Sequence, residues 1–382
     1  MKRFFLFAAV AVTAITACTK NELASENIGN EISFQAANYV TATKLAGAEF
    51  PKTETFGTYA WTAGTAGTFF IQNNVVSYNA TKDVWTTATP YYWPKNQSVD
   101  FFSYYPYHEG GNLPTVTANQ ITYSNVDFSL TSRQVDFMYA DKAVGYTDNA
   151  NQVEDGQSAR GGVPTFFRHA GAKVKVNVVL GENEKHETVS DTYTKWEVEL
   201  TEVVLSGLYV KGSCVLNLSS TDNGIIPWTK PQDATNTYYV WDPDTSLTND
   251  TENTLFKNVQ HYNLVSGTGV NVIPEFYALP QVLAADQQKI ALKVNIKAYR
   301  KIGAAAEYPT DPYLTQTGKV VSADLLIDTG TPGTSVFAWQ MNQAITYDIT
   351  LGPAGQQITF DPAVDAWDAH NYATSIDISL GL

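Results

Sequence analysis

Cysteine is scarce in this chain. Its 382 residues include two cysteines, Cys18 and Cys214, and these cannot build the disulfide framework that stabilises small exported domains. Cys214 lies in the stretch 212–218 without an arrangement of histidine and acid around it, so we expect a buried, inert thiol. Stability must therefore come from buried apolar surface, and the chain is long enough for two cores of ordinary size.

Positive charge is also in short supply. The chain has 24 Lys and Arg against 38 Asp and Glu, which gives a formal net charge of -14. Loss of an N-terminal leader that contains Lys2 and Arg3 would remove two positive charges and bring the net charge to -16. A chain this acidic has no electrostatic reason to bind nucleic acid or an anionic lipid surface.

Signatures of catalysis and metal binding are missing. Paired acids at 242–244 and 324–328 lack the glycine and the oxygen-ligand spacing of a calcium loop, and no nucleophile elbow, phosphate loop or dinucleotide fingerprint is present. We therefore expect no enzymatic activity, catalytic residue, metal or cofactor. The five histidines are not spaced as metal ligands with another His or Cys: His108, His169, His186, His261 and His370.

One apolar run stands out, at the N-terminus. Positive charge at Lys2 and Arg3 precedes the apolar residues 4–12, a run too short to span a bilayer and typical of a secretory signal, here 1–17. The end of the signal, 15–18, resembles the bacterial lipobox, whose cysteine becomes the first mature residue and carries acyl chains. We expect an outer-membrane lipoprotein precursor lipidated at Cys18; an ordinary signal with a chance cysteine is the alternative.

The remainder of the chain favours strands over helices. Aromatic residues make up 13% of the chain, Thr and Val are abundant, and turn signals recur about every 8 to 12 residues, as in a β-sandwich or barrel. No long amphipathic helix is evident. The expected strands of the first half are 31–36, 55–61, 68–71, 75–78, 83–87 and 97–106. Those of the second half are 173–180, 195–205, 213–218, 237–241, 269–273, 275–279, 289–299, 319–327, 344–351 and 357–360.

A polar stretch rich in Asp, Asn, Gln and Gly, 145–162, divides the strands into two groups. We interpret it as a domain linker. The expected organisation after the signal is then a short polar tether, two β-domains in tandem and a tail. Their limits are 18–30 for the tether, 31–160 and 161–367 for the N-terminal and C-terminal domains, and 368–382 for the tail.

Several motifs, in their order and spacing, resemble one family. They are the lipobox with the tether residues 18–22, then 32–34, 56–60, 136–140, 167–170 and 339–351. Together these resemble the fimbrillin-like lipoproteins of Bacteroidetes, the subunits of type V pili, over nearly the whole chain. The resemblance implies two transthyretin-like (Greek-key) β-sandwich domains. It also implies a precursor that moves from the outer membrane to a cell-surface fimbrium and supports adhesion.

The resemblance further implies assembly by strand exchange. A sandwich that loses one strand exposes unpaired backbone groups above an apolar groove, which a strand of another pilin subunit can fill. The implied lost strand is the first, about 31–40, with Ile32 and Phe34 as its inward side chains.

A trypsin-like maturation protease would release that strand by cutting the loop after it, where Lys44 and Lys52 are the candidate sites. The best-known members of the family use arginine in this loop, whereas the first arginine after the leader is Arg133. An arginine-specific protease is therefore not expected. The alternative is that both lysines are solvated loop charges and that no cut occurs.

The candidate donor strand lies beyond Trp367. Apolar residues alternate there with Asp, Ser and Gly. The tail either enters the groove of the next subunit or forms an edge strand of its own second domain, because a period of two looks alike in both settings. The alternating apolar residues are Ile376, Ile378, Leu380 and Leu382.

Aromatic clusters at 91–93 and 101–107 support a different function. Such side chains stack on sugars at binding surfaces, although in a sandwich they are more often core residues. The alternative to a polymerising subunit is thus a surface or tip lipoprotein that binds glycans or host ligands.

Overall fold

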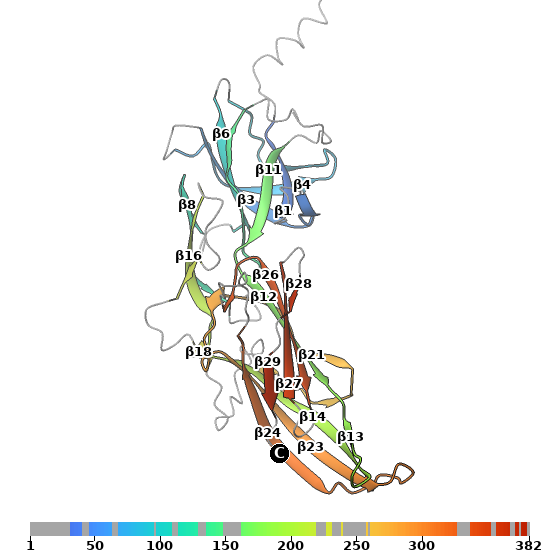
Figure 1. Cartoon of the computed structure of the whole chain (residues 1–382). Coiled ribbons are helices and arrows are strands. Elements are labelled where there is room, and N and C mark those ends of the chain that lie inside the picture. Colours follow the sequence, from blue (N-terminus) through green and yellow to red (C-terminus); the bar gives the residue numbers. More distant parts are fainter. Residues whose placement is uncertain are drawn as a thin grey trace, which may run out of the picture. The chain divides into compact units, whose positions relative to one another are not determined.

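The computed structural model of the chain describes its strands and most of their connections (Figure 1). The described residues are 31–39, 46–62, 68–94, 97–108, 114–128, 135–147, 162–218, 227–230, 238–239, 257–258, 260–326, 337–352, 357–366, 371–373 and 376–379. Only the backbone is described for 38–39, 46–49, 238–239, 257–258 and the ranges from 357 onward. These residues form strands, turns and bends without a helix, so the all-β expectation is confirmed. Among them, no helix is long and apolar enough to cross a membrane.

The described chain divides into two compact units. The first contains the residues up to Asn38 together with Ala48–Tyr107 and Ala140–Phe167, and the second contains Tyr39–Gly47, His108–Tyr139 and Arg168–Leu382. The units interleave along the sequence, because β8 pairs with β16 in the second unit while β11 pairs with β1 in the first. These limits differ from a single division near residue 160.

One sheet organises the first unit. Its strands follow the order β10-β6-β3-β4-β5-β1-β11-β9, with β2 joined to β1 and a further pairing of β6 with β9. The bounds are β1 Ser33–Tyr39, β2 Ala46–Glu49, β3 Thr55–Thr62, β4 Ile71–Asn79, β5 Val84–Thr87, β6 Val99–Tyr105, β9 Met138–Ala140, β10 Ala143–Tyr146 and β11 Val163–His169. The ranges 68–71 and 75–78, expected as two strands, belong to the single strand β4, which has a positive φ of 42° at Asn73.

The second unit contains two six-stranded sheets. One has the order β21-β12-β26-β27-β28 with β29 on β27, and the other has the order β13-β14-β23-β24 with β19 and β20 on β14. The first comprises β12 Ala172–Leu180, β21 Gly269–Ala278, β26 Gln343–Leu351, β27 Gln357–Ala366, β28 Asn371–Ala373 and β29 Ile376–Ser379. The second comprises β13 Glu184–Glu187, β14 Thr192–Ser206, β19 Lys257–Asn258, β20 Tyr262–Leu264, β23 Lys289–Ile302 and β24 Leu314–Asp324.

Smaller sheets complete the second unit. A four-stranded sheet has the order β17-β16-β8-β7, and two pairs are β15-β18 and β22-β25. Their bounds are β7 Thr115–Val116, β8 Gln120–Asp127, β15 Leu208–Tyr209, β16 Lys211–Asn217, β17 Trp228–Thr229, β18 Tyr238–Tyr239, β22 Gln281–Val282 and β25 Ala338–Trp339.

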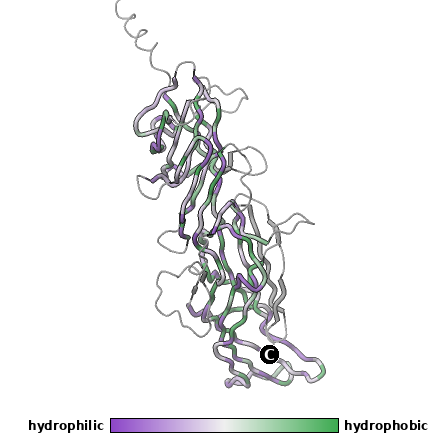
Figure 2. Tube along the Cα trace, turned by 90° about the vertical axis from the view of Figure 1, so that its left-hand side faces the viewer, coloured by the Kyte–Doolittle hydropathy of each residue, from purple (hydrophilic) through white to green (hydrophobic). Residues whose placement is uncertain are grey.

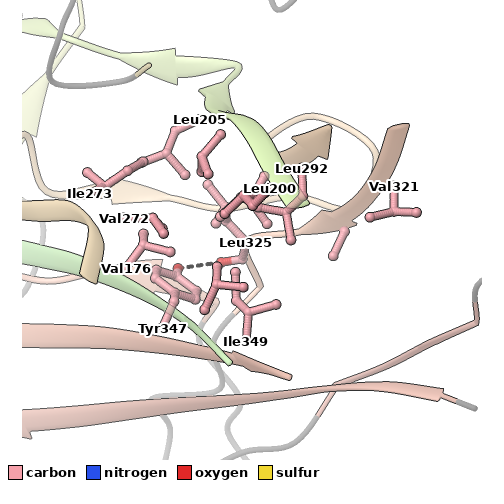
Figure 3. Packing of buried hydrophobic residues seen from close by; sticks show 14 of the residues in the cluster. Val176, Leu200, Leu205, Val272, Ile273, Leu292, Val321, Leu325, Tyr347 and Ile349 are labelled. Carbon is pink, nitrogen blue, oxygen red and sulfur yellow. Dashed lines mark hydrogen bonds between the residues drawn. The ribbon is translucent and has the colours of Figure 1, made fainter. Parts of the chain in front are cut away.

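Alternating sequence produces the core of the second unit. Along β12 every second side chain is buried, and hydrophobic and hydrophilic positions alternate along the strands (Figure 2). The buried sides of the two large sheets meet in one apolar cluster, in which Val176 and Ile349 lie opposite Leu200 and Leu292 (Figure 3). This is the arrangement of a β-sandwich.

A buried tyrosine connects this core by hydrogen bonds. The Tyr347 hydroxyl donates to the Leu325 carbonyl at 2.9 Å (Figure 3). It also accepts a hydrogen bond from Trp339 Nε1 at 2.9 Å. Burial raises the pKa of Tyr347 far above its usual value. The phenol is thus held neutral in the folded chain, because an ionised form would lack solvation there.

One proline explains a difference from the expected strands. The ranges 269–273 and 275–279 form the single strand β21, which continues through Pro274. Proline lacks an N–H, so in sheets it occupies edge strands and bulges. Pro274 has this setting, because β21 is the last strand of its sheet and its register with β12 shifts near Val176.

Candidate functional site: the seat of the first strand

The first strand, β1, lies inside its sheet. It pairs in parallel with β11, where Phe34 is opposite Val163, and antiparallel with β5, where Ser33 is opposite Thr86 and Phe34 is opposite Trp85. Just before the strand, the Ile32 N–H donates to the Tyr91 carbonyl at 2.8 Å. Removal of β1 would therefore leave unpaired backbone groups on both neighbouring strands.

The inward side chains of β1 fill an aromatic core. Ile32 is 0% exposed and Phe34 is 1% exposed. The Phe34 ring meets the rings of Phe56 and Phe101 edge to face, with centroids at 6.0 Å and 5.8 Å. The two side chains singled out in the sequence are thus both buried, and Phe34 packs against aromatic rings of β3 and β6.

Phe50 belongs to the same core, which the sequence did not reveal. Its side chain is 1% exposed, and its ring lies 4.8 Å from that of Phe167 and 5.8 Å from that of Phe56. It follows β2 and precedes a turn closed by the Glu54 N–H and the Pro51 carbonyl. A lone phenylalanine between an expected loop and a turn carries no periodic signal, so sequence patterns could not place it.

Of the two candidate cleavage lysines, Lys52 lies in the described part of the chain. Lys44 lies outside the described residues. Lys52 is exposed in the turn after Phe50, where its ammonium lies 3.9 Å from Asp83 Oδ1 and 4.6 Å from the centre of the Tyr78 ring. Lys52 therefore combines an exposed side chain with a backbone held in a turn beside a buried ring.

An ion pair borders the start of β1. The Lys82 ammonium contacts the Glu31 carboxylate, and the side chains are 50% and 28% exposed. The Asn79 side chain accepts hydrogen bonds from the N–H groups of Thr81 and Lys82 at 3.0 Å and 3.1 Å, which fixes the β4–β5 turn that presents the lysine. Glu31 and Lys82 both line an open cleft of about 680 Å³, together with Ser77, Thr86 and Tyr92.

The tail pairs with its own unit. The backbone of β29 runs antiparallel to β27, with Ile376 opposite Phe360 and Ile378 opposite Ile358. Within the part of the chain that the structure describes, its pairing is on one side, because β29 joins the sheet through β27 alone. Leu380 and Leu382 lie outside the described residues, as does Cys18.

Two motifs of the sequence meet in the second unit. His169 Nδ1 lies 2.8 Å from an Asp136 carboxylate oxygen, and the Ala170 N–H donates to the Phe137 carbonyl at 2.7 Å. His169 is 4% exposed. These contacts connect the stretch 136–140 to the stretch 167–170 and give the buried His169 a polar partner. Among the described residues, no group of three or more His, Cys, Asp or Glu could hold a metal ion.

Half of the eight aromatic residues in the two clusters are core residues. Buried examples are Trp93, Phe101, Phe102 and Tyr104, which cannot stack on an external ligand. Tyr92 is the exposed exception in the first cluster, at 43%. Cys214 is fully buried, as expected. Burial raises its thiol pKa to about 12, which disfavours the reactive thiolate.

These features define an all-β protein whose first strand completes an aromatic core formed with later strands. The chain matches the family model described as fimbrillin-like over residues 43–367, and it belongs to that family. It is accordingly a structural fimbrial subunit of the cell surface rather than an enzyme. No curated protein sequence matches the chain.

Solved structures that match the chain include fimbrial proteins from Bacteroides vulgatus and Porphyromonas gingivalis. A fimbrial protein from Bacteroides vulgatus matches at 17% identity and a TM-score of 0.49, covering 88% of this chain and 99% of the other. The fimbrial anchor protein Mfa2 from Porphyromonas gingivalis matches at 13% identity and a TM-score of 0.33, covering 90% of this chain and 100% of the other. The chain also matches the C-terminally truncated tip fimbrial protein Mfa3 from Porphyromonas gingivalis. That match has 11% identity and a TM-score of 0.33, and it covers 92% of this chain and 100% of the other.

Proposed function

We propose that the chain is a pilus subunit assembled by strand exchange. In this proposal the precursor, two tandem transthyretin-like domains anchored in the outer membrane through lipid on Cys18, loses β1 to a protease. The tail of another subunit then takes its place. The observation that carries the proposal is the seat of β1 between β5 and β11, with Ile32 and Phe34 fully buried.

The free energy contributed by the contacts of β1 explains why a subunit without β1 would need a replacement strand. Burial of a side chain such as Ile or Phe contributes about 1.5–3 kcal/mol, and two such side chains leave with β1. The backbone groups of β5 and β11 would lose their partners as well. A subunit without β1 is therefore strongly driven to accept another strand.

Phe50 favours Lys44 over Lys52 as the site of the cut. A cut after Lys52 would detach Phe50, and with it the contacts to Phe56 and Phe167 that the remaining core uses. A cut after Lys44 removes β1 and leaves Phe50 in its chain. The backbone at Lys52 also lies in a closed turn, whereas proteases bind extended segments, so local unfolding would have to come first.

The tail suits the role of donor because its pairing is one-sided. As an edge strand, β29 leaves its own sheet by breaking a single ladder with β27. Its residues also alternate in the way that the groove requires, with an apolar residue at every second position. Main-chain pairing supplies continuity in such complexes, and alternate side chains dock in pockets.

Limited digestion with a lysine-specific protease tests the proposal. The purified chain, Lys44→Gln and the matched variant Lys52→Gln are digested, and assembly is followed by electron microscopy and by gels without boiling. We expect rods from the wild-type chain and from Lys52→Gln but not from Lys44→Gln. Monomers after complete removal of β1 would contradict strand exchange.

Two further variants test the anchor and the donor. Cys18→Ala is expected to abolish acylation of the precursor and its anchoring in the outer membrane, because the chain then has no thiol at that position to carry acyl chains. Removal of residues 374–382 is expected to stop assembly while leaving cleavage intact. Rods from that truncated chain would exclude the tail as donor.

A further inference from the structure

The tail contains a near copy of the sequence that begins β1. Residues 31–36 read Glu-Ile-Ser-Phe-Gln-Ala, and residues 377–382 read Asp-Ile-Ser-Leu-Gly-Leu. Both begin with an acid, continue with Ile-Ser, and place apolar residues at the second, fourth and sixth positions. Asp377 is the one acid between Tyr372 and Leu382, so this alignment is unique within the tail.

The positions shared by the two segments have defined surroundings in the groove. Glu31 pairs with Lys82 and bridges Tyr92, and Ile32 donates its N–H to the Tyr91 carbonyl. Removal of β1 with the residues before it would also remove the Glu31 carboxylate, and Lys82 would lose that partner. A donor strand that carries an acid at the same point would restore the pair.

We propose that the tail of a second copy enters the groove in the direction and register of β1, with Asp377 beside Lys82. This inference rests on the proposed strand exchange and fixes its geometry. The donor runs parallel to β11 and antiparallel to β5. The matched positions are Glu31 with Asp377, Ile32 with Ile378, Ser33 with Ser379, Phe34 with Leu380, and Ala36 with Leu382.

The opposite direction lacks this complementarity. A reversed tail also places apolar residues at every second position, because a period of two reads the same both ways. It would bring Leu382 and Leu380 to the places of Ile32 and Phe34, and no acidic side chain of the tail would lie beside Lys82. An acidic side chain at the place of Glu31 therefore occurs in only one of two directions that apolar alternation leaves equal.

Cysteine pairing between copies tests the register. Ser33 lies opposite Thr86 on β5, so Ser379 of the donor should lie opposite Thr86 of the acceptor, within the reach of a disulfide. Full chains carrying Thr86→Cys with Asp377→Cys, Ser379→Cys or Gly381→Cys are cut, assembled and oxidised. Cys214 stays, since its thiol is buried.

A ladder of covalently joined subunits is expected with Ser379→Cys and not with the other two. A disulfide through Asp377→Cys would indicate a register shifted by two residues, and one through Gly381→Cys would indicate the reversed strand. Either result would overturn the proposed register and leave strand exchange standing. Chains that stay monomeric after complete loss of β1 would overturn both. The three chains differ only in the position of the donor cysteine, so they control for one another.

The ion pair gives a second, independent test. Because Lys82 is half exposed, its pair with Asp377 should change the critical concentration for assembly by about 1.5-fold to 5-fold. Asp377→Asn and Lys82→Gln should each raise it by this factor, and the double variant should raise it no further. Independent, multiplying effects of the two substitutions would overturn the contact.

Discussion

Truncation of the Phe34 side chain should affect the stability of the precursor and of the assembled fibre differently. Phe34 is 1% exposed and contacts two aromatic rings at 6.0 Å and 5.8 Å. Large-to-small changes of buried phenylalanine lower the free energy of unfolding by about 3–5 kcal/mol. Phe34→Ala should destabilise the precursor by this amount. In a fibre from which β1 has departed, the same substitution should have no effect.

Phe101→Ala is the matched control. Phe101 is also 1% exposed and contacts Phe34, but it belongs to β6, which stays in the subunit. It should destabilise precursor and fibre alike. Denaturant unfolding of both forms, together with hydrogen exchange of the β3 and β6 amides, gives the comparison. A fibre destabilised by Phe34→Ala as much as by Phe101→Ala would refute the departure of β1.

Three other substitutions test the structure directly. A Cβ at Gly162 would lie 2.8 Å from the Phe34 carbonyl carbon, so Gly162→Ala should loosen β1 by about 1–3 kcal/mol and speed its hydrogen exchange. Gly207 and Gly267 have φ of +72° and +71°, but a Cβ lies 2.0 Å from a carbonyl oxygen only at Gly207; in thermal melts Gly267→Ala should lose about 1–2 kcal/mol and Gly207→Ala clearly more. Tyr347→Phe should cost about 1–3 kcal/mol at pH 7 through its two lost hydrogen bonds. The pKa of Tyr347 in the folded chain lies above its value of 10.0 in the unfolded chain. The free energy of unfolding of the wild-type chain should therefore fall as the pH rises above 10, and thermal melts should show a smaller fall for Tyr347→Phe.

Sequence patterns predicted many of the strands because alternation is local, but not β8 to β11. β12 and β26 were found almost to the residue, since every second side chain of β12 faces one core. The buried positions of Ile32 and Phe34 follow from the same period. What the period cannot give is the partner of a strand, so the parallel pairing of β1 with β11, far along the chain, appears only in three dimensions.

The remaining features of the site depend on contacts between distant residues. Glu31 and Lys82 are 51 positions apart, and neither lies in a motif. His169 and Asp136 each belonged to a recognised motif, yet their contact could not be derived from either alone. Phe50 was missed for a third reason, because it sits between elements and not within one.

The positions of the two strands suggest why exchange would run forward. β29 is paired on one side, with β27, whereas a strand in the place of β1 is paired on both sides, with β5 and β11. Each backbone hydrogen bond contributes about 0.5–1.5 kcal/mol net, so a tail that moves from edge to interior gains a second ladder. It also exchanges an edge position for a closed aromatic core. β1 holds that place in the structure, and cleavage followed by its departure would make the gain available. The cut would then control when assembly begins, and the difference between one ladder and two would supply its direction.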